Sequence, residues 1–400
     1  MKKIVLSTIA ALAIGATGLS ATQFYVDDNG QVFTTKGEGR KAINLEEAAK
    51  VLDSAEAPKE KILGGFFDRF HGEGDLRLRQ EVVEKEGSAD LNHERYRFRY
   101  FLNFDVTDNI TLETGVSSGK YNPTSGNVSF KDDENIQEYF IDELKIDVAD
   151  IKYSFGNSWA RVGKQKHQIY RPIKTQLVWD NDFRLEGVNY GYKDESTMIV
   201  VGANRIHREK DNREGGNINI LLAQYVHTQK LDDAKVNLGA AYYHYDNVKG
   251  NTDPYGSFKG NTSETVNGVK VYKENYGIVE AFAELKLKDV MGMPFKTALT
   301  LAYNAQASDD NFGYDLSAEL DMTKKWKAAV TYRDVEKDAV FGAHNDSDFS
   351  GGGTDNNGYY VKTKYAFAKN VDVAGWWNWS KLGDLELDYH RVQLDVILKF

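Results

Sequence analysis

The chain has 400 residues, no cysteine and a formal net charge of −10, from 60 acidic and 50 basic side chains. The absence of cysteine excludes disulfides and thiolate metal sites, and the acidic balance argues against nucleic acid as a partner. Aromatic residues are abundant, with 23 Tyr, 20 Phe and 6 Trp. Tyr and Trp rings suit the boundary between a membrane and water.

Residues 1–21 have the pattern of a secretory signal peptide. Lys2 and Lys3 precede an apolar run that ends near Ile14, and small residues up to Ala21 provide a cleavage site. A transmembrane anchor is the alternative, but the apolar run is shorter than the roughly 20 residues that span a bilayer as a helix. We therefore expect an exported protein.

Residues 22–64 differ from the rest of the chain and are predicted to form a small α/β appendage. Two short apolar runs in residues 24–33 flank an Asn-Gly pair, which is typical of a hairpin turn. Asn44 can cap a helix over residues 45–52, where apolar residues recur on one face. We expect a periplasmic segment beside the following domain. The alternatives are a plug inside that domain and a coiled-coil contact between subunits.

From about Gly65 to Phe400, segments of alternating apolar and polar residues recur. Each is close to the roughly ten residues that a tilted transmembrane β-strand needs, and alternate side chains of a strand point to opposite faces. The sixteen predicted strands are Asp75–Glu81, Arg95–Val106, Ile110–Ser117, Tyr139–Val148, Ala160–Gln165, Leu185–Tyr192, Thr197–Asn204, Ile218–Val226, Lys235–Tyr245, Val279–Leu287, Phe295–Tyr303, Tyr314–Leu320, Trp326–Arg333, Tyr359–Phe367, Val371–Trp379 and Leu387–Phe400.

The connections between these strands alternate in length. Short ones carry turn residues, such as Thr107-Asp108-Asn109, and long ones are polar and glycine-rich, such as Asp246–Gly277. This asymmetry is typical of an outer-membrane barrel. A stack of helices is excluded because the helical period recurs only in one short segment. All 5 prolines fall outside the predicted strands, as their missing N–H requires.

These patterns predict an all-β fold over residues 65–400, a transmembrane antiparallel β-barrel of about sixteen strands. An eighteen-stranded, substrate-specific channel is the closest structural alternative. It would need two further weak strands, which the long connection Asp246–Gly277 has room to contain.

The last predicted strand ends on Phe400. Apolar residues occupy every second position from Val392 to Phe400, and mostly polar residues occupy the positions from Arg391 to Lys399. One face therefore suits hydrocarbon and the other suits water. The strand resembles the closing strand of bacterial outer-membrane β-barrels, whose final Phe is part of the assembly signal. The resemblance implies that Phe400 has this role toward the barrel assembly machinery.

Arginines occupy one face of the first two predicted strands. In the second strand they alternate with Tyr96, Phe98 and Tyr100, and in the first with Leu76 and Leu78. Guanidinium groups on the lipid side would be very costly. We therefore expect these arginines in the lumen: Arg77, Arg79, Arg95, Arg97 and Arg99. Two interpretations stay open, a wall paired with acids for stability and the basic side of a pore constriction.

The connection from Lys166 to Phe183 is unusually apolar for an exposed loop, with Leu177, Val178 and Trp179 in succession. Surface loops are normally polar, so this one is expected to pack against another part of the protein. Two carboxylates stand near its end, and they are the expected acidic partners of the arginines: Asp180 and Asp182.

A sixteen-stranded barrel whose fifth-to-sixth strand loop folds inward resembles the porins of Gram-negative outer membranes. Ala160–Gln165 is similar to the Gly-Arg-Gln strand end that precedes this loop in many of them, with Lys164 in place of the arginine. The resemblance covers residues 65–400 and points to a general or substrate-selective porin of the epsilonproteobacterial type. In that family the loop carboxylates face an arginine cluster across the pore, which here opposes Asp180 and Asp182 to the five arginines.

The resemblance implies a channel in the bacterial outer membrane that lets small hydrophilic solutes and ions diffuse passively through a charge-lined aqueous pore. It also implies a homotrimer in contact with outer-membrane lipid and lipopolysaccharide. No cofactor, metal or catalytic activity is expected. A structural or adhesive surface barrel is one alternative, which an open lumen would distinguish from a porin, and a barrel-embedded hydrolase is another.

No other motif points to catalysis or metal binding. The 8 histidines lack zinc-ligand spacing, and no Gly-x-Ser-x-Gly or phosphate-loop sequence occurs. Asp346, Asp348 and Asp355 lie in a Gly- and Asp-rich stretch that could bind calcium, but the EF-hand pattern is absent. We expect a mobile, solvated loop at this stretch.

Overall fold

The computed structural model describes residues 24–27, 32–33, 36–43, 64–119, 122–130, 144–207 and 216–400. The chain forms two compact units, divided between Arg69 and Phe70. The expected signal peptide and the expected helix over residues 45–52 lie outside the described residues. Within the described residues, no helix is both long and apolar enough to cross a membrane.

The first unit contains a small antiparallel sheet. Strand β1 (Phe24–Val26) pairs with β2 (Val32–Phe33) on one side and with β3 (Lys41–Ile43) on the other, and the four-residue helix α3 (Gly64–Phe67) follows. The pairing of β1 with β2 is the one that the Asn-Gly hairpin predicted. Strand β3 was not predicted, because three residues are too few to show a period.

A protein that keeps residues 1–21 but lacks residues 22–64 is expected to form the same barrel, because the strands of the closed barrel all begin at Phe70 or later. Heat-modifiable mobility on SDS gels measures the folded fraction. Loss of the folded form while export is intact would show that residues 22–64 belong to the barrel assembly.

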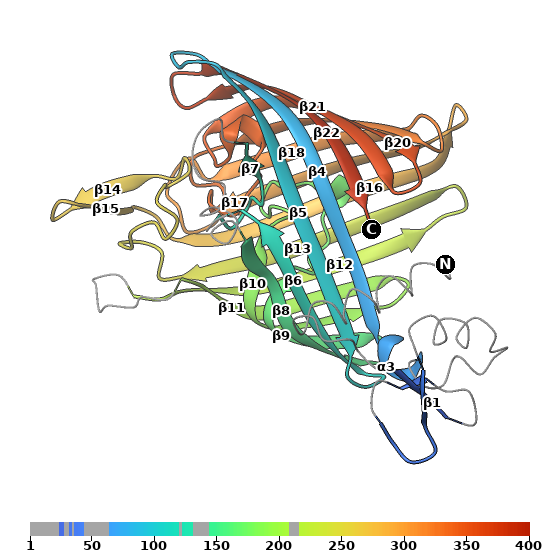
Figure 1. Ribbon diagram of the computed structural model, residues 1–400. Helices are drawn as coiled ribbons and strands as arrows, with labels where there is room; N and C mark the ends of the chain where they lie inside the picture. Colours follow the sequence, from blue (N-terminus) through green and yellow to red (C-terminus); the bar gives the residue numbers. More distant parts are fainter. Residues whose placement is uncertain are drawn as a thin grey trace. The chain divides into compact units, whose positions relative to one another are not determined.

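The second unit is a closed barrel of antiparallel strands (Figure 1). Its long strands have nine to sixteen residues. They are β4 (Phe70–Lys85), β5 (Leu91–Asp105), β6 (Ile110–Ser118), β8 (Leu144–Phe155), β9 (Ser158–Lys166), β10 (Arg184–Lys193), β11 (Thr197–His207), β12 (Ile218–Lys230), β13 (Ala234–Asp246), β16 (Tyr276–Val290), β17 (Met293–Asn304), β18 (Phe312–Asp321), β19 (Trp326–Val335), β20 (Asn356–Ala368), β21 (Val371–Leu382) and β22 (Leu387–Lys399).

These sixteen strands correspond one to one with the predicted strands, and β22 closes the ring by pairing with β4. Most are longer than predicted, and the fourth is shifted from Tyr139–Val148 to Leu144–Phe155. The barrel begins at Phe70 rather than at Gly65. The prediction for the prolines is wrong at Pro294, the second residue of β17, a position near a strand start that tolerates the missing N–H.

In β22 the apolar side chains are exposed and the polar side chains are buried, which is the reverse of the arrangement in a soluble protein. Its apolar residues Leu394 and Val396 are 56% and 40% exposed, whereas Gln393 and Asp395 between them are 2% and 7% exposed. A protein that exposes alternate apolar side chains and buries alternate polar ones is suited to an apolar surrounding outside and a polar interior. The alternation of residues 391–400 predicted this arrangement, with one face suited to hydrocarbon and the other to water.

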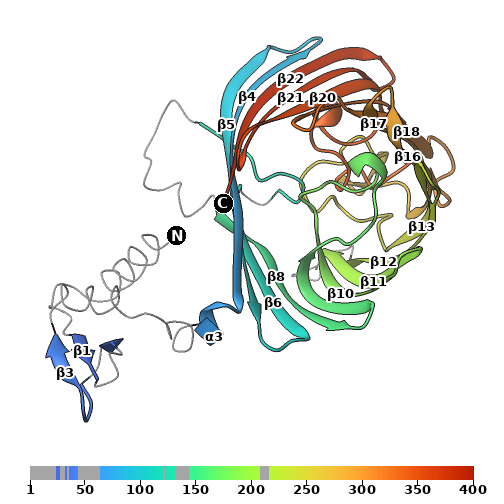
Figure 2. The ribbon, with the colours of Figure 1, turned by 90° about the vertical axis from the view of Figure 1, so that its right-hand side faces the viewer.

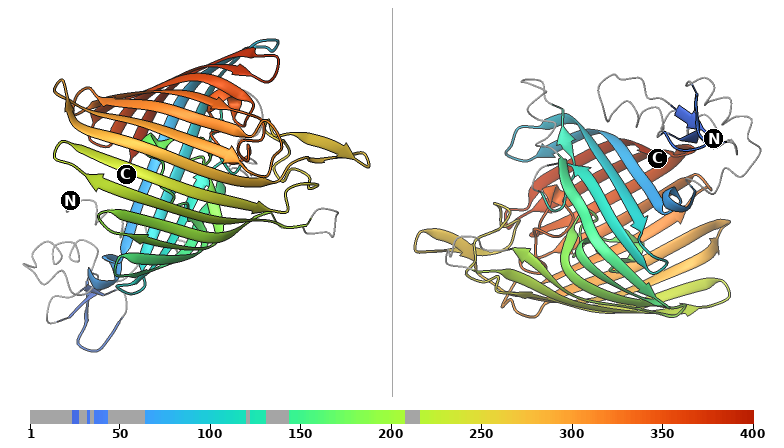
Figure 3. Two further views of the ribbon diagram at one scale, coloured as in Figure 1. Left: turned by 180° about the vertical axis from the view of Figure 1, so that it is seen from behind. Right: turned by 60° about the horizontal axis from the view of Figure 1, so that its bottom comes forward.

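Two further strands lie within the long connection after β13. Strands β14 (Ser263–Val266) and β15 (Val269–Tyr272) pair only with each other, and Figure 3 shows this hairpin, in yellow, projecting from one end of the barrel. The described barrel therefore does not gain two strands, and the eighteen-stranded alternative is wrong. A two-residue strand, β7 (Val128–Ser129), adds to β5 beside Arg95.

The apolar core of the described residues lies mostly inside the barrel. Residues of the β9–β10 connection, among them Leu177 and Trp179, form one cluster with Val340 and Phe341 of the β19–β20 connection and with side chains of the wall. The short helical turns η1 (Pro172–Lys174) and η2 (Phe349–Gly351) lie within the ring of strands, drawn in green and orange in Figure 2. Two connections thus fold inward.

Candidate functional site

The five predicted arginines lie together on the lumen side of β4 and β5. The register places Arg77 opposite Arg97 and Arg79 opposite Arg95. Arg79 is 5% exposed, whereas its neighbour Leu78 on the other face is 43% exposed. Like charges directly opposite each other destabilise a sheet, so this wall needs carboxylates close by.

Carboxylates of the same wall supply this compensation. Each of the five arginines has a carboxylate oxygen within 3.8 Å. The pairs are Asp75–Arg97 (3.0 Å), Asp75–Arg99 (2.7 Å), Glu81–Arg95 (3.1 Å), Asp395–Arg79 (2.7 Å) and Asp395–Arg77 (3.8 Å). The wall is thus an ion-pair network, which stabilises the lumen surface whether or not it also acts on solutes.

The connection between β9 and β10 crosses the lumen. On the side opposite the arginines, the Ile173 N–H donates to Glu284 of β16 at 3.0 Å, and the Thr175 hydroxyl donates to Asp315 of β18. Leu177 between these contacts and Asp182 is fully buried. The apolar composition of this segment is explained by its path through the barrel interior.

At its other end this loop reaches the arginine wall. The Asp182 carboxylate accepts hydrogen bonds from Arg99 at 2.9 Å and from Arg97 at 3.3 Å. Burial disfavours the charge, but Arg97 and Arg99 outweigh it and lower the pKa of Asp182 below its usual value. The carboxylate is therefore ionised at neutral pH and lies against two of the five arginines.

A second inward loop, between β19 and β20, approaches the same wall. Its Asp348 lies 3.4 Å from Arg79 and 3.1 Å from Arg391 of β22. Burial opposes the charge of Asp348, but Arg79 and Arg391 lower its pKa. The expectation of a mobile, solvated loop here is wrong, because residues 339–346 are buried without a break.

Two features of the sequence could have located this second loop. The run Ala339-Val340-Phe341 is apolar in the way that residues 177–179 are, and the same argument applies to it. Arg391 shares the polar face of the last strand with Gln393 and Asp395, so the alternation already places it in the lumen.

A closed barrel, a loop that crosses its interior and an ion-paired arginine wall together describe a channel-forming architecture. A sequence model of the family described as putative porin matches residues 80–276 and 281–400. The chain belongs to this porin family. It is an outer-membrane porin, which forms a passage for small solutes across the bacterial outer membrane.

Solved structures with a similar chain path include OmpF of Salmonella typhi in complex with daunomycin, at 10% identity and a TM-score of 0.49, covering 83% of this chain and 97% of OmpF. A loop L8 deletion mutant of OmpT from Vibrio cholerae has 13% identity and a TM-score of 0.48, with 83% and 100% covered. A mutant of the Rh. blastica porin has 12% identity and a TM-score of 0.47, with 83% and 100% covered. No curated protein matches the chain.

Asp180 of the porin has surroundings different from those of Asp182. Its carboxylate accepts hydrogen bonds from the backbone N–H groups of Asp182, at 2.7 Å, and Ser347, at 3.0 Å. Burial, together with Asp182 and Asp346, raises the pKa of Asp180 well above its usual value. Among the described contacts none joins Asp180 to the five arginines, and the residue instead connects the two inward loops.

His344 lies where the inward loops meet. Tyr245 of β13 contacts its Nδ1 at 3.0 Å and Tyr255 contacts its Nε2 at 3.3 Å, while Phe183 packs on its ring with centroids 4.0 Å apart. The His344 carbonyl also accepts the Asp180 N–H at 2.7 Å. Burial lowers the pKa of His344 to about 3, so this contact is uncharged at neutral pH.

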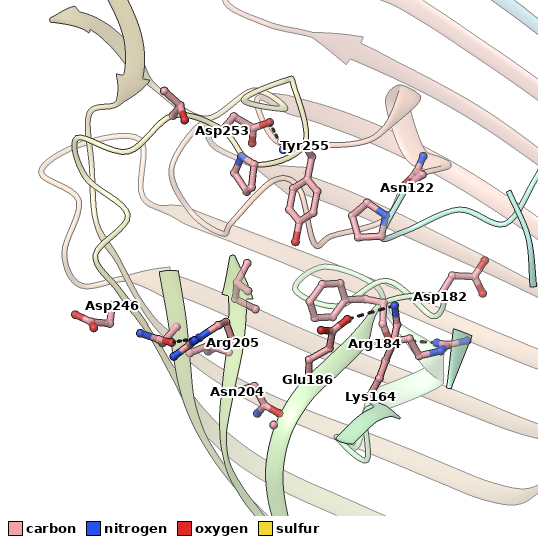
Figure 4. Close-up of a pocket in the computed structure, with 18 of the residues that line it drawn as sticks. Asn122, Lys164, Asp182, Arg184, Glu186, Asn204, Arg205, Asp246, Asp253 and Tyr255 are labelled. Carbon is pink, nitrogen blue, oxygen red and sulfur yellow. Dashed lines mark hydrogen bonds and ion pairs between the residues drawn. The ribbon is translucent and has the colours of Figure 1, made fainter. Parts of the chain in front are cut away.

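A cavity of about 2220 Å³ lies beside Asp182. Figure 4 shows the loop of Asp253 and Tyr255 on one side of it and Lys164 and Glu186 on the other. Lys164 lies 3.2 Å from Glu186. Charges of both signs line this space, which is therefore suited to water and polar solutes.

Two of the three aspartates in the Gly- and Asp-rich stretch lie against arginines of the protein. Asp346 lies 3.4 Å from Arg333 and Asp348 lies against Arg79 and Arg391. In the part of the chain that the structure describes, no group of three or more His, Asp or Glu side chains could hold a metal ion.

Proposed function

We propose that the porin passes small hydrophilic solutes and ions by passive diffusion through a constriction beside the contact between Asp182 of the crossing loop and the arginines of β4 and β5. The observation that carries this proposal is the pairing of Asp182 with Arg97 and Arg99 at 3.3 and 2.9 Å, which brings a carboxylate of the crossing loop into contact with the arginine wall and so narrows the lumen there. Fixed charges of opposite sign at a narrow point create a transverse field, and such a field sorts solutes by charge and size.

The proposed basic side comprises Arg77, Arg79, Arg95, Arg97 and Arg99, and the proposed acidic side is Asp182. Asp180 is proposed to act indirectly, because its contacts with Asp182 and Ser347 hold the crossing loop in place. The ion pairs of the wall keep the arginines extended and ordered. With Arg391 the network has six arginines, against five carboxylates, Asp75, Glu81, Asp182, Asp348 and Asp395. From this small excess of positive charge we propose a mild preference for anions.

Transport of this kind needs no covalent step, so we propose a channel without catalytic activity or cofactor. We further propose a homotrimer that contacts outer-membrane lipid and lipopolysaccharide and is inserted by the barrel assembly machinery. The exposed apolar residues of the outer face, such as Leu394 and Tyr225 at 56% and 49%, support contact with lipid. For residues 22–64 we propose a periplasmic location.

Planar-bilayer recordings of variants test the constriction. Changing Arg97 and Arg99 together to Ser is expected to lower the chloride-to-potassium permeability ratio by about twofold or more, because two fixed positive charges leave the narrow part of the pore. Asp182→Asn is expected to raise the ratio. Both shifts should be larger at 0.05 M than at 1 M salt, where the Debye length falls to about 3 Å.

The matched control changes Lys324 and Lys325 to Ser. These two lysines are exposed in a short turn, so the same charge is removed away from the proposed constriction. Reversal potentials that stay at the wild-type value in both test variants, or that move equally in the control, would place the residues outside the constriction.

A further inference from the structure

A second group of positive charges lies on the wall opposite the arginines. Lys235 of β13 pairs directly with Lys286 of β16, and Lys286 pairs with Lys296 of β17. Across β18 and β19 the same row continues through Glu319 and Ala329 to Lys362 of β20. With Lys364 of β20 and Lys174 of the crossing loop, these residues form what we call the lysine arc.

The lysine arc faces the lumen. The Lys286 ammonium donates to the Tyr170 hydroxyl of the crossing loop at 3.1 Å, and directly paired residues of neighbouring strands share a face, which places Lys235 and Lys296 beside it. Lys235 is the second residue of β13 and Lys296 the fourth of β17. The arc therefore lies in the half of the lumen toward the short turns.

Carboxylates compensate this group only in part. Glu284 lies 3.1 Å from Lys286, Asp372 lies 2.8 Å from Lys364, and Glu319 pairs with Lys296. Six lysines thus face three carboxylates, one of which, Asp372, also pairs with Lys399 at 2.5 Å. Within the described contacts, Lys174, Lys235 and Lys362 pair with no carboxylate.

The row is costly for folding, since like charges directly opposite each other destabilise a sheet. The arginine wall contains the same kind of contact, with Arg77 opposite Arg97, but each of its five arginines has a carboxylate oxygen within 3.8 Å. In the lysine row no acid separates Lys235, Lys286 and Lys296. A destabilising arrangement on a lumen wall points to a use for the uncompensated charge.

The crossing loop brings one more ammonium to the arc through a strained turn. Ile173 and Lys174 have φ values of 45° and 59°, a backbone region that is costly for residues other than glycine and especially for β-branched ones. The turn η1 packs against β16, β17 and β18, and the Lys174 side chain is exposed. Partial desolvation of its ammonium inside the barrel and then the charge of Lys364 lower the pKa of Lys174, which agrees with a position facing the arc.

Lys362 is held without an anionic partner. Its ammonium lies 4.7 Å from the Tyr360 ring centroid and 5.6 Å from that of Trp376. Cation–π contacts of this kind orient an ammonium group and leave its positive charge available. Lys362 is half-buried rather than enclosed, so a solute in the lumen can reach it.

We propose that the lysine arc binds small divalent oxyanions at successive positions along the row on their way through the porin. Adjacent strands are about 4.8 Å apart, so neighbouring ammonium groups can donate to one tetrahedral anion at the same time. A monovalent anion gains less from the group than a divalent one, because the Coulomb energy scales with charge. The site rests on the proposed function, since it needs an aqueous lumen through which anions pass.

Sulfate is the probe, because it stays divalent over the working pH range. The full-length porin is reconstituted in a planar bilayer in 0.1 M KCl, and sulfate is added to both sides. We expect sulfate to lower the chloride current along a saturable curve. The variant Lys174→Gln, Lys235→Gln, Lys362→Gln should need about tenfold more sulfate for half-block, which corresponds to about 1.4 kcal/mol.

The control variant changes Lys324, Lys325 and Lys369 to Gln. These lysines are exposed in short turns at the same end of the barrel, so it loses equal charge and should keep the wild-type half-block. If the triple arc variant does not fold, as judged by heat-modifiable mobility, the single variants Lys235→Gln and Lys362→Gln should each shift the half-block by about twofold.

Equal half-block in the arc and control variants, or no saturable block in the wild-type porin, overturns the arc as a binding site. Such a result leaves the constriction intact, because the reversal potentials of the Arg97 and Arg99 variants test that independently. A folded porin that conducts no chloride would overturn the proposed function, and the arc with it.

Discussion

Replacing Phe400 with Asp is expected to abolish most of the folded barrel. The backbone of Phe400 exchanges two hydrogen bonds with Gly74 of the first barrel strand, at 2.7 and 3.1 Å, and these bonds belong to the seam where β22 meets β4. The ring packs over Gly74 and beside Phe98 and Tyr100, with centroids 6.3 and 6.4 Å away. Gly74 has no Cβ, and the Phe400 ring occupies the space that a Cβ would need.

The carboxylate would remove this aromatic packing, worth about 0.5–1.5 kcal/mol per pair, and would place a charge on the lipid-facing side of the seam. The pairing of β22 with β4 satisfies the edge hydrogen bonds of both strands, so a weakened seam leaves two exposed edges. The amount of heat-modifiable protein in the outer membrane measures the result. We expect this amount to fall about tenfold or more, because a loss of roughly 1.4 kcal/mol changes an equilibrium constant tenfold.

Phe367→Asp is the matched control. Phe367 is an exposed aromatic residue near the end of β20, at 64% exposure compared with 56% for Phe400, but it lies away from the seam. If Phe400→Asp and Phe367→Asp reach the outer membrane in equal amounts, the seam contact has no special weight. If Phe400→Asp folds at the wild-type level, the role of Phe400 in assembly is wrong.

Arg333→Met is expected to release both inward loops and to raise the single-channel conductance. Arg333 of β19 donates to both oxygens of Asp315, each at 2.7 Å, and lies 3.4 Å from Asp346 of the second loop. Asp315 also accepts the hydroxyl hydrogen bond of Thr175 from the crossing loop. One buried ion pair on the wall therefore anchors both loops.

Removing the guanidinium leaves Asp315 and Asp346 buried without their cation, and a broken buried ion pair costs about 3–5 kcal/mol. We expect a larger and noisier conductance and a lower midpoint of heat unfolding on SDS gels. Lys327→Met, on the same strand, removes a cation that is 50% exposed and pairs with Asp321 at 3.0 Å, and exposed pairs contribute only about 0–1 kcal/mol. Wild-type conductance and heat stability in Arg333→Met would show that the loops are held by other contacts.

The sequence alone determined the strands and the face that each presents. Alternation with a period of two is a local property, so Tyr96 and Phe98 could be placed on the outside and Arg95 and Arg97 on the inside without knowledge of any distant contact. The apolar run at Leu177 likewise showed that one loop could not remain in water. Both inferences depend only on the free energy of transferring side chains between water and an apolar surrounding.

The paths of the loops and the pairing of the charges depend on contacts between distant parts of the chain. Asp348 and Arg79 are 269 positions apart. The nearby apolar run Ala339-Val340-Phe341 indicates a buried loop, but nothing local to Asp348 identifies Arg79 as its partner. Asp180 and Asp182 are two residues apart and were given one role, yet one meets the loop backbone and the other meets Arg97. The contacts of an irregular segment depend on its backbone path, which residues far along the chain determine.

The lysine arc also combines a feature that the sequence predicts with one that depends on the tertiary structure. Alternation places Lys235 on the lumen face of its strand, but that it lies beside Lys286 and Lys296 depends on how three strands are aligned. Shifting a strand by two residues keeps every side chain on its face and changes all of its lateral neighbours. Periodicity in the sequence therefore determines the face of a residue, whereas the register, which hydrogen bonds and loop contacts set throughout the closed barrel, determines its partners.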